Sequence, residues 1–310
     1  MSLELIVLGS GTSAGVPMIG CDCPVCTSDD PRDNRMRASV LVRWTDDGLP
    51  DTEANREAVA FNAEQAGVRQ VLIDASPDLR VQAIRERLSR LDGVVYTHMH
   101  ADHVFGTDDL RRFNAVMGQP IDVFAERQTL DALSDMLPYI FQAKRGPNKK
   151  TFIANLIAHE LHAGEGFDWF GSRWTPVRLM HGRLPILGFR VDFGGVSGGA
   201  SGGASLAYCT DVSTVPPESW RLLEGLDVLI IDGLRHRHHP THMTVERACE
   251  VAEQLGAKQT YLTHIAHDLM HAEVDAALPD GVNLAYDGLR IKLDGHHTGA
   301  MPNATATAKR

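Results

Sequence analysis

Short apolar runs bounded by polar or glycine-containing turns recur along most of the chain, and runs of this length predict β-strands. Apolar positions at helical spacing predict two helices between strands, one over residues 78–91 and one over 244–255. The predicted strands form a first group at 3–8, 38–44, 70–74 and 94–97, and a second group at 173–180, 186–193, 205–210, 228–232 and 259–263. The pattern therefore predicts a mixed α/β (α+β) fold in two halves.

Three segments differ from this pattern. Residues 45–67 are polar and rich in Glu and Asn, and we expect an inserted loop or short helix there. Residues 194–204 are mostly glycine and small residues between two strands, which predicts a flexible hairpin tip. The stretch 295–310 is small and polar, and we expect it to be disordered. We therefore expect one domain over residues 1–294 followed by a tail over 295–310.

Composition supports a single soluble domain. The chain has 310 residues, of which 43 % are hydrophobic, enough to bury one large core. It has no apolar run of the 18 or more residues that span a bilayer. The first apolar run lacks the basic start and cleavage site of a secretion signal, so it fits a first strand. From these features we expect a cytoplasmic protein.

The charge balance disfavours two kinds of partner. A net charge of −10 works against general binding to nucleic acid or to an anionic membrane. The exception is the basic segment 144–150, in which the pairs Lys144–Arg145 and Lys149–Lys150 flank a glycine and a proline. A solvated loop is the favoured interpretation of this segment, over a loop at the mouth of a functional site.

The most informative motif directly follows the predicted strand at 94–97. It has the sequence His-Met-His-Ala-Asp-His, from His98 to His103. Side chains alternate in an extended segment, so His98 and His100 point toward one cation, whereas the next turn directs Asp102 and His103 toward a neighbouring one. The motif predicts parts of two metal sites, although the 15 histidines of the chain also make a chance match conceivable.

Corroboration comes from three further residues. His181, Asp211 and His264 each follow a separate predicted strand. One such residue alone would usually be an ordinary polar strand terminus. Three of them at strand ends, where side chains can converge, instead favour a dinuclear metal centre.

A second cluster contains three thiols within six residues. Cys21, Cys23 and Cys26 supply three ligands for a tetrahedral structural zinc, and His267, three residues after His264, is the natural fourth. The alternatives are a disulfide with a spare thiol, or reduced cysteines without a partner. Oxidation is disfavoured because no export signal is evident.

The ligand series resembles that of the metallo-β-lactamase superfamily, over nearly the whole chain. The early cysteines and the Thr-His-Ile-x-His segment look like those of the bacterial phosphoribosyl 1,2-cyclic phosphate phosphodiesterases of the carbon–phosphorus lyase pathway. The resemblance implies a four-layer αββα sandwich and a hydrolase domain over 1–294. It implies that one metal is held by His98, His100 and His181, the other by Asp102, His103 and His264, with Asp211 bridging them and Asp74 orienting a ligand histidine.

The acidic residue at the bridging position favours phosphodiester chemistry. In this superfamily the branch that opens β-lactam rings has Cys at this position, whereas this chain has Asp211. A carboxylate can bridge cations about 3.5–4 Å apart, the spacing suited to clamping a phosphoryl group. Cys209, two residues earlier, fits a buried strand residue better than a ligand.

The remaining chemistry is proton transfer to the leaving group. Alignment with the cyclic phosphodiesterases places His242 where a histidine that is not a ligand assists catalysis, so His242 is our candidate general acid or phosphate contact, with an ordinary loop histidine as the alternative. Arg235 is a weaker candidate for binding the substrate phosphate. Together with Asp211 these residues predict hydrolysis of a small cyclic or nucleotide-like phosphodiester by metal-activated hydroxide.

Other functions share parts of the pattern. A tRNA 3′-processing nuclease and a glyoxalase II-type thioesterase would use the same ligands, and a non-catalytic nucleotide-binding or sensor protein could keep the scaffold. Imidazole and carboxylate ligands admit Zn, Mn or Fe in the dinuclear centre, in addition to the structural Zn. The expected partner is a small phosphodiester, and a homodimer is compatible with the resemblance because dimers are common in this fold family.

Overall fold

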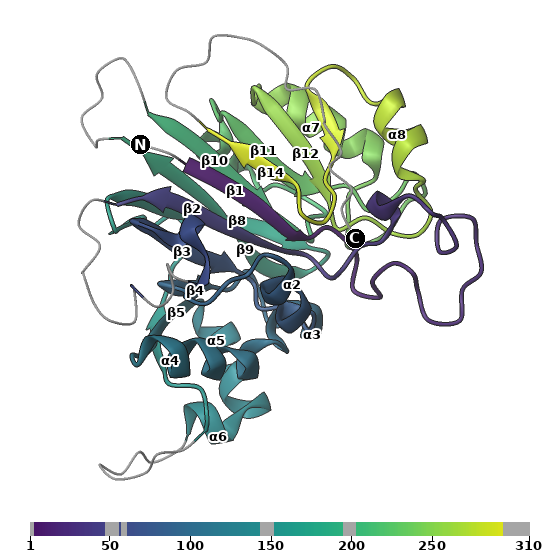
Figure 1. The fold of residues 1–310 in the computed structure, drawn as a ribbon. Helices are drawn as coiled ribbons and strands as arrows, with labels where there is room; N and C mark the ends of the chain where they lie inside the picture. The colour runs from purple at the N-terminus through teal and green to yellow at the C-terminus, as the bar shows by residue number, and fades with distance from the viewer. Residues whose placement is uncertain (1–2, 47–55, 57–60, 143–151, 195–202, 294–310) are drawn as a thin grey trace.

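The computed structural model describes residues 3–46, 56, 61–142, 152–194 and 203–293. Two seven-stranded sheets face each other (Figure 1). The first sheet has the order β14-β1-β2-β3-β4-β5-β6. Its strands are β1 (Leu3–Gly9), β2 (Ser39–Thr45), β3 (Val68–Ile73), β4 (Gly93–Val95), β5 (Ile121–Ala125), β6 (Leu156–Glu160) and β14 (Arg290–Lys292).

The second sheet repeats this plan. Its order is β13-β12-β11-β10-β9-β8-β7, with antiparallel pairs from β7 to β10 and parallel pairs from β10 to β13. The first sheet likewise runs from antiparallel pairs around β1 to parallel pairs from β3 to β6. The strands are β7 (Phe167–Trp169), β8 (Ser172–His181), β9 (Leu184–Phe193), β10 (Ala204–Cys209), β11 (Val228–Asp232), β12 (Gln259–Thr263) and β13 (Val282–Leu284).

Helices cover the outer face of each sheet. Figure 1 shows the helices α2 to α6 on one side and α7 and α8 on the other. Buried side chains such as Leu5, Val40 and Phe189 fill the space between the sheets, and separate apolar clusters lie under each helical layer. The helices are α2 (Leu79–Arg85), α3 (Ala101–Val104), α4 (Leu110–Met117), α5 (Arg127–Met136), α6 (Pro138–Phe141), α7 (Val245–Leu255) and α8 (His271–Ala277). The predicted αββα architecture is confirmed.

The predicted strands and helices are confirmed at their centres, but the first predicted helix ends earlier than expected. The helix predicted over 78–91 ends at Arg85, because Arg87 takes a left-handed conformation (φ 52°) and Leu88 N–H donates to the Ala83 carbonyl. Leu91 is buried in the following loop. The helix predicted over 244–255 is α7, whose N-cap Thr244 accepts a hydrogen bond from Arg247 N–H.

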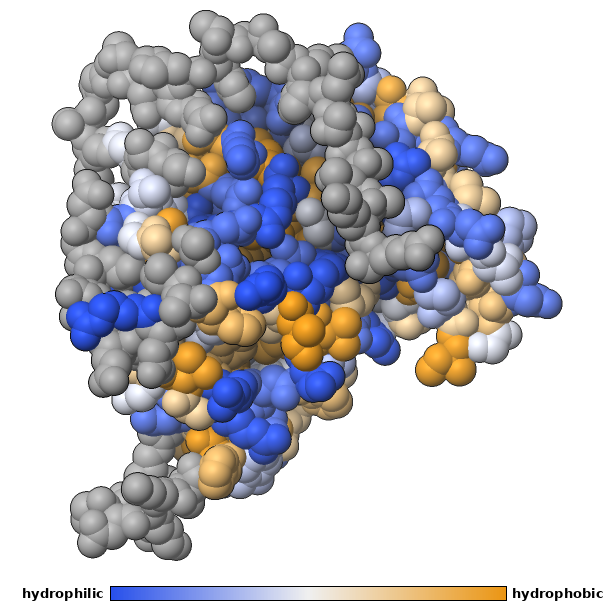
Figure 2. Space-filling model, in the orientation of Figure 1, coloured by the Kyte–Doolittle hydropathy of each residue, from blue (hydrophilic) through white to orange (hydrophobic). Residues whose placement is uncertain are grey.

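Several predictions fall on parts of the chain that the structure does not describe. They concern most of the insertion at 45–67, the basic segment 144–150, the glycine-rich segment at 195–202 and the tail 295–310. None of the described helices is long and apolar enough to span a bilayer. On the face shown in Figure 2, apolar residues occur as small separate groups among hydrophilic ones.

Candidate active site

The candidate ligands lie where strands of both sheets end. Asp74 follows β3, the His-x-His-x-Asp-His motif follows β4, His181 ends β8, Asp211 follows β10 and His264 follows β12. Because the carboxyl ends of neighbouring parallel strands meet at one edge, residues far apart in the sequence converge there. The antiparallel strand β8 reaches the same edge through its pairing with β9.

Three of these residues have an unusual backbone conformation. Asp74, Asp211 and His264 have φ angles of 65°, 59° and 59°. Positive φ is uncommon outside glycine and is retained mainly where a functional site requires it. In each case the turn directs a polar side chain into the cluster directly after a buried strand.

Four donor groups converge around Asp211. Ligand atoms of Asp102, His103, Asp211 and His264 all lie within 4.8 Å of one another. The Asp211 Oδ2 atom is 3.1 Å from His103 Nε2, and its Oδ1 atom is 3.3 Å from His264 Nε2. This set contains the three residues that the family resemblance implies for the second metal, together with Asp211 as the implied bridging ligand.

Asp211 also belongs to a set on the other side of the cluster, with His181 and His242. The rings of His98, His100 and His181 pack together on that side, with centroids 4.5 Å apart for His98 and His100 and 5.1 Å apart for His100 and His181. Asp211 is therefore shared between the two halves of the cluster, as a bridging carboxylate must be.

Buried acceptors fix the orientation of the ligand rings. Asp74 Oδ2 accepts from His103 Nδ1 at 2.7 Å, while Thr97 N–H donates to Asp74 Oδ1. His181 Nδ1 donates to the Thr241 carbonyl at 2.8 Å. In both rings Nδ1 is used, so Nε2 remains for a metal.

The charges of the cluster suit cations. Burial raises the pKa of Asp211, but His264 and His103 outweigh it and hold this pKa well below its usual range. Burial and the neighbouring His103 lower the pKa of His98 well below its usual value. The site thus contains an ionised carboxylate and a neutral imidazole, the forms that bind metals. Burial lowers the pKa of His103 and of His264, but the neighbouring carboxylates outweigh it and raise both pKa values, and bound cations would displace these protons.

Buried ring nitrogens without a partner also fit metal ligation. Among the described residues, His98 Nε2 and His103 Nε2 are buried, lie within the cluster and form no hydrogen bond of regular geometry. An unpaired polar atom of this kind is unfavourable unless something coordinates it. The residues present therefore fit two divalent cations.

His242 lies beside the cluster and is held by an acid that the sequence analysis did not single out. Its Nδ1 atom donates to Asp232 Oδ2 at 2.6 Å, and its ring stacks on His264 with centroids 4.7 Å apart. Asp232 is fully buried at the end of β11, and burial raises its pKa despite the nearby His242. Its place after an apolar strand is the same sequence signal that identified Asp211.

Two other residues lie outside the metal cluster. Arg235 is half-buried, and its Nε donates to the Arg237 carbonyl, so its predicted contact with substrate phosphate stays a prediction. Cys209 is fully buried, which raises the pKa of its thiol to about 12. As expected, it belongs to the strand and is in none of the metal-binding sets among the described residues.

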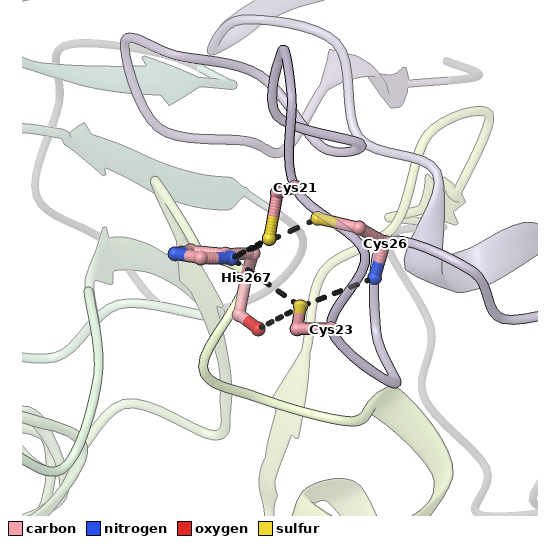
Figure 3. Close-up of side chains that lie close together, drawn as sticks. All are labelled: Cys21, Cys23, Cys26 and His267. Carbon is pink, nitrogen blue, oxygen red and sulfur yellow. Dashed lines mark hydrogen bonds between the residues drawn. The ribbon is translucent and has the colours of Figure 1, made fainter.

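The second predicted cluster also assembles. Figure 3 shows the three cysteine sulfurs around the ring of His267. The Sγ atoms of Cys21, Cys23 and Cys26 lie 3.3, 3.4 and 3.7 Å from His267 Nδ1. A hydrogen bond from Cys26 N–H, together with His267, lowers the pKa of Cys23 to about 6. Four donors and a thiol that ionises easily fit a tetrahedral zinc.

Comparisons with known proteins agree with this geometry. Residues 69–265 match the family model described as a beta-lactamase superfamily domain. The crystal structure of a diphosphatase from the PhnP family is 40 % identical, with a TM-score of 0.77, and the match covers 95 % of this chain and 98 % of that one. The chain belongs to the PhnP family of the metallo-β-lactamase superfamily. The family resemblance is thereby confirmed, as is its consequence that the chain is a metal-dependent hydrolase.

Two curated relatives add context to this PhnP-family chain. An octanoyltransferase from Porphyromonas gingivalis (strain ATCC BAA-308 / W83) is 35 % identical over 94 % of this chain. The chain spans about half of that relative, 52 % of its length. A ribonuclease Z from Lachnoclostridium phytofermentans (strain ATCC 700394 / DSM 18823 / ISDg) is 25 % identical over 66 % of this chain and 80 % of that protein.

Proposed function

We propose that the chain hydrolyses small phosphodiester-type substrates, cyclic or nucleotide-like, at a dinuclear metal centre. The observation that carries this proposal is the place of Asp211, which belongs to donor sets on both sides of the cluster. A bridging carboxylate with imidazole ligands suits zinc, manganese or iron. The diphosphatase activity of the 40 % identical relative supports attack at phosphorus.

The residues around the centre have distinct roles in this scheme. Two cations held by the cluster would polarise the phosphate and bring the pKa of a water toward about 7. Asp232 holds the Nδ1 hydrogen of His242, so Nε2 is the nitrogen that can give a proton to the leaving oxygen. Asp74 keeps the ring of His103 turned toward the centre.

The location and partners follow from the same reasoning and stay proposals. A cysteine-held structural zinc suits a reducing compartment, so we place the protein in the cytoplasm. With its net charge of −10 we propose a small anionic substrate and no general nucleic-acid binding. A homodimer remains compatible with this scheme.

A panel of substrates with defined metals tests the proposed function. The purified protein is assayed with manganese or zinc on a cyclic nucleotide, a bis-aryl phosphodiester, a precursor tRNA and an acyl-glutathione thioester. We expect turnover of the small phosphorus esters and its loss in Asp211→Ala. Rapid turnover of the thioester alone would identify a thioesterase, turnover of the tRNA alone a processing nuclease, and nucleotide binding without turnover a sensor.

A further inference from the structure

The turn that follows β10 holds the backbone of Asp211 in place. Asp211 takes a left-handed conformation, with a φ of 59°. After it, Val212 N–H donates to Asp232 Oδ2 at 3.1 Å, and Ser213 N–H donates to the Met180 carbonyl at 2.8 Å. The backbone around the bridging residue therefore has a fixed position relative to β8 and β11.

The carboxylate of Asp211 needs a separate constraint, because a fixed backbone does not fix its two oxygens. The torsion between Cβ and the carboxylate carbon of an aspartate is broad, so the carboxylate can rotate. In the structure, Thr210 Oγ1 donates to Asp211 Oδ2 at 2.8 Å. Thr210 is fully buried, and a hydrogen bond is stronger in such surroundings than in water. The hydroxyl of Thr210 thus selects one orientation of the carboxylate.

Thr210 differs from the histidines that contact Asp211, because it is not a candidate ligand. The Asp211 oxygens also lie 3.1 Å from His103 Nε2 and 3.3 Å from His264 Nε2. A ring nitrogen that coordinates a metal carries no hydrogen, so these two contacts cannot remain hydrogen bonds in the loaded centre. The Thr210 hydroxyl keeps its hydrogen, and an ionised carboxylate can only accept it. Thr210 can therefore hold Asp211 in the same orientation with and without cations.

Two other candidate ligands also directly follow a buried threonine. Thr97 precedes His98, and Thr263 precedes His264. Thr97 Oγ1 donates to Asp74 Oδ2 at 2.8 Å, whereas Thr263 Oγ1 forms no hydrogen bond with the described residues. A buried threonine before a ligand is thus not sufficient to orient a carboxylate, because its hydroxyl must also reach one. Thr263 is for this reason a natural control for a threonine that does.

We propose that Thr210 is a positioning residue whose hydroxyl orients the bridging carboxylate of Asp211 before the cations bind. The inference rests on the dinuclear centre of the proposed function and deepens it, because it names a residue outside the ligand set on which metal binding depends. Without the hydroxyl, the carboxylate would have to be ordered at the moment of binding, which lowers affinity. Removing a hydrogen bond that orients a metal ligand typically costs about 10- to 100-fold in metal affinity.

Two pairs of proteins isolate this hydroxyl. Wild type and Thr210→Val differ by a hydroxyl in place of a methyl group, and Thr210→Ser and Thr210→Ala differ by the hydroxyl alone. The second pair decides the question if Thr210→Val does not fold, which circular dichroism shows. The readout is the binding of manganese to protein dialysed against a chelator, followed through the electron paramagnetic resonance signal of free Mn²⁺. Manganese suits this measurement because thiolates select softer metals, so the signal reports on the imidazole and carboxylate centre.

The expected affinities follow the presence of the hydroxyl. Thr210→Val should bind manganese about 10- to 100-fold more weakly than wild type, and Thr210→Ala more weakly than Thr210→Ser by a similar factor. Thr210→Ser keeps the donor and should stay within about threefold of wild type. The matched control is Thr263→Val, which removes a buried hydroxyl without a partner from the residue before His264 and should also stay within about threefold of wild type.

The outcomes separate this role from general packing and from the proposed function. Unchanged affinity in Thr210→Val and Thr210→Ala, or an equal loss in Thr263→Val, overturns the proposal. A loss in Thr210→Ser as large as that in Thr210→Ala assigns the effect to the missing methyl group and also overturns it. Wild type that binds manganese but hydrolyses none of the phosphorus esters contradicts the proposed function, while the manganese affinities still decide the role of Thr210. Wild type that binds no manganese contradicts both.

Discussion

Asp232 determines which nitrogen of His242 carries a proton. Replacing it in Asp232→Asn keeps the size of the side chain but removes the charge that orients the imidazole and stabilises its protonated form. We expect kcat on substrates with a poor leaving group to fall about 100-fold or more, in the range of general acid catalysis. Steady-state kinetics across a series of leaving groups measures this, because nitrophenolate departs without a proton and should be affected least.

A double variant shows whether the two residues act as one unit. If Asp232 works through His242, then Asp232→Asn combined with His242→Gln should be no slower than His242→Gln alone. Multiplied losses in the double variant would contradict the positioning role of Asp232. Metal content and circular dichroism should match wild type in all three proteins.

Gly182 allows two loops of the site to pack closely. It has a φ of 61°, and a Cβ atom added there would lie 2.8 Å from Cγ2 of Thr241. Gly182→Ala should therefore destabilise the fold by about 1 kcal/mol or more through the left-handed backbone. It should also lower activity, because Thr241 positions the rings of His181 and His239.

The steric part of this effect can be separated from the backbone part. Thr241→Ser removes Cγ2 and keeps the hydroxyl, so adding it to Gly182→Ala should restore much of the activity and leave the loss of stability. Denaturant unfolding and kcat/KM of the three variants are the measurements. An unchanged kcat/KM in Gly182→Ala would show that the loop contact is not needed for catalysis.

At the scale of elements, the segment after β12 connects the two candidate metal sites. It holds His264 at one end and His267 three residues later. Between them Ile265 N–H donates to the Ser10 carbonyl, and the buried Arg35 donates to the Ala266 carbonyl. The position of His264 in the active centre therefore depends on how this segment is held at the cysteine cluster.

Removing one thiol should affect both sites. For wild type loaded with metal we expect about three metals per chain by elemental analysis. Cys23→Ser should lose the structural zinc and lower activity about 10- to 100-fold, as for residues that support a ligand. Cys249→Ser is the control, because Cys249 is half-buried on α7 and outside the cluster. Equal metal content in wild type and Cys23→Ser would contradict the zinc assignment.

The sequence identified those elements whose pattern is local. Strands such as β11 are uninterrupted apolar runs, and the ligands directly follow them, so both could be found from periodicity. The strands β5 and β14 were not predicted. Each is short: β5 has five residues, of which only alternate ones are fully buried, and β14 has only three, too short to distinguish from a loop. The pairing of Asp232 with His242 depends on closure of a loop, which no local pattern reports.

At the scale of the whole molecule, the first and last described strands lie side by side in one sheet. The strand β14 pairs with β1, so the first sheet includes both ends of the described chain. A second link joins segments far apart in the sequence, because the buried Asp33 binds Arg35 and also accepts from His271 N–H. An N-terminal loop and a C-terminal helix are thus joined through buried polar groups, and such groups make stability depend on pH.

His271 is the group in this second link whose titration we expect to measure. It is 1 % exposed, and burial followed by the nearby Arg32 lowers its pKa to about 4. Arg35 acts in the same direction, whereas Asp275 and Asp30 oppose it in part. In the unfolded chain the pKa is about 6.5. Between these values the unfolded chain binds a proton that the folded one does not, so stability falls as the pH falls from about 6.5 to about 4.

Denaturant unfolding at a series of pH values tests this dependence. The difference between the two pKa values corresponds to at most about 3 kcal/mol, present above pH 6.5 and lost by about pH 4. His271→Gln cannot titrate, so its stability should fall less than that of wild type over this interval. Loss of metals in acid affects both proteins alike, which makes the difference between them the relevant quantity. Parallel curves for the two proteins would show that the His271 ring titrates normally in the folded state.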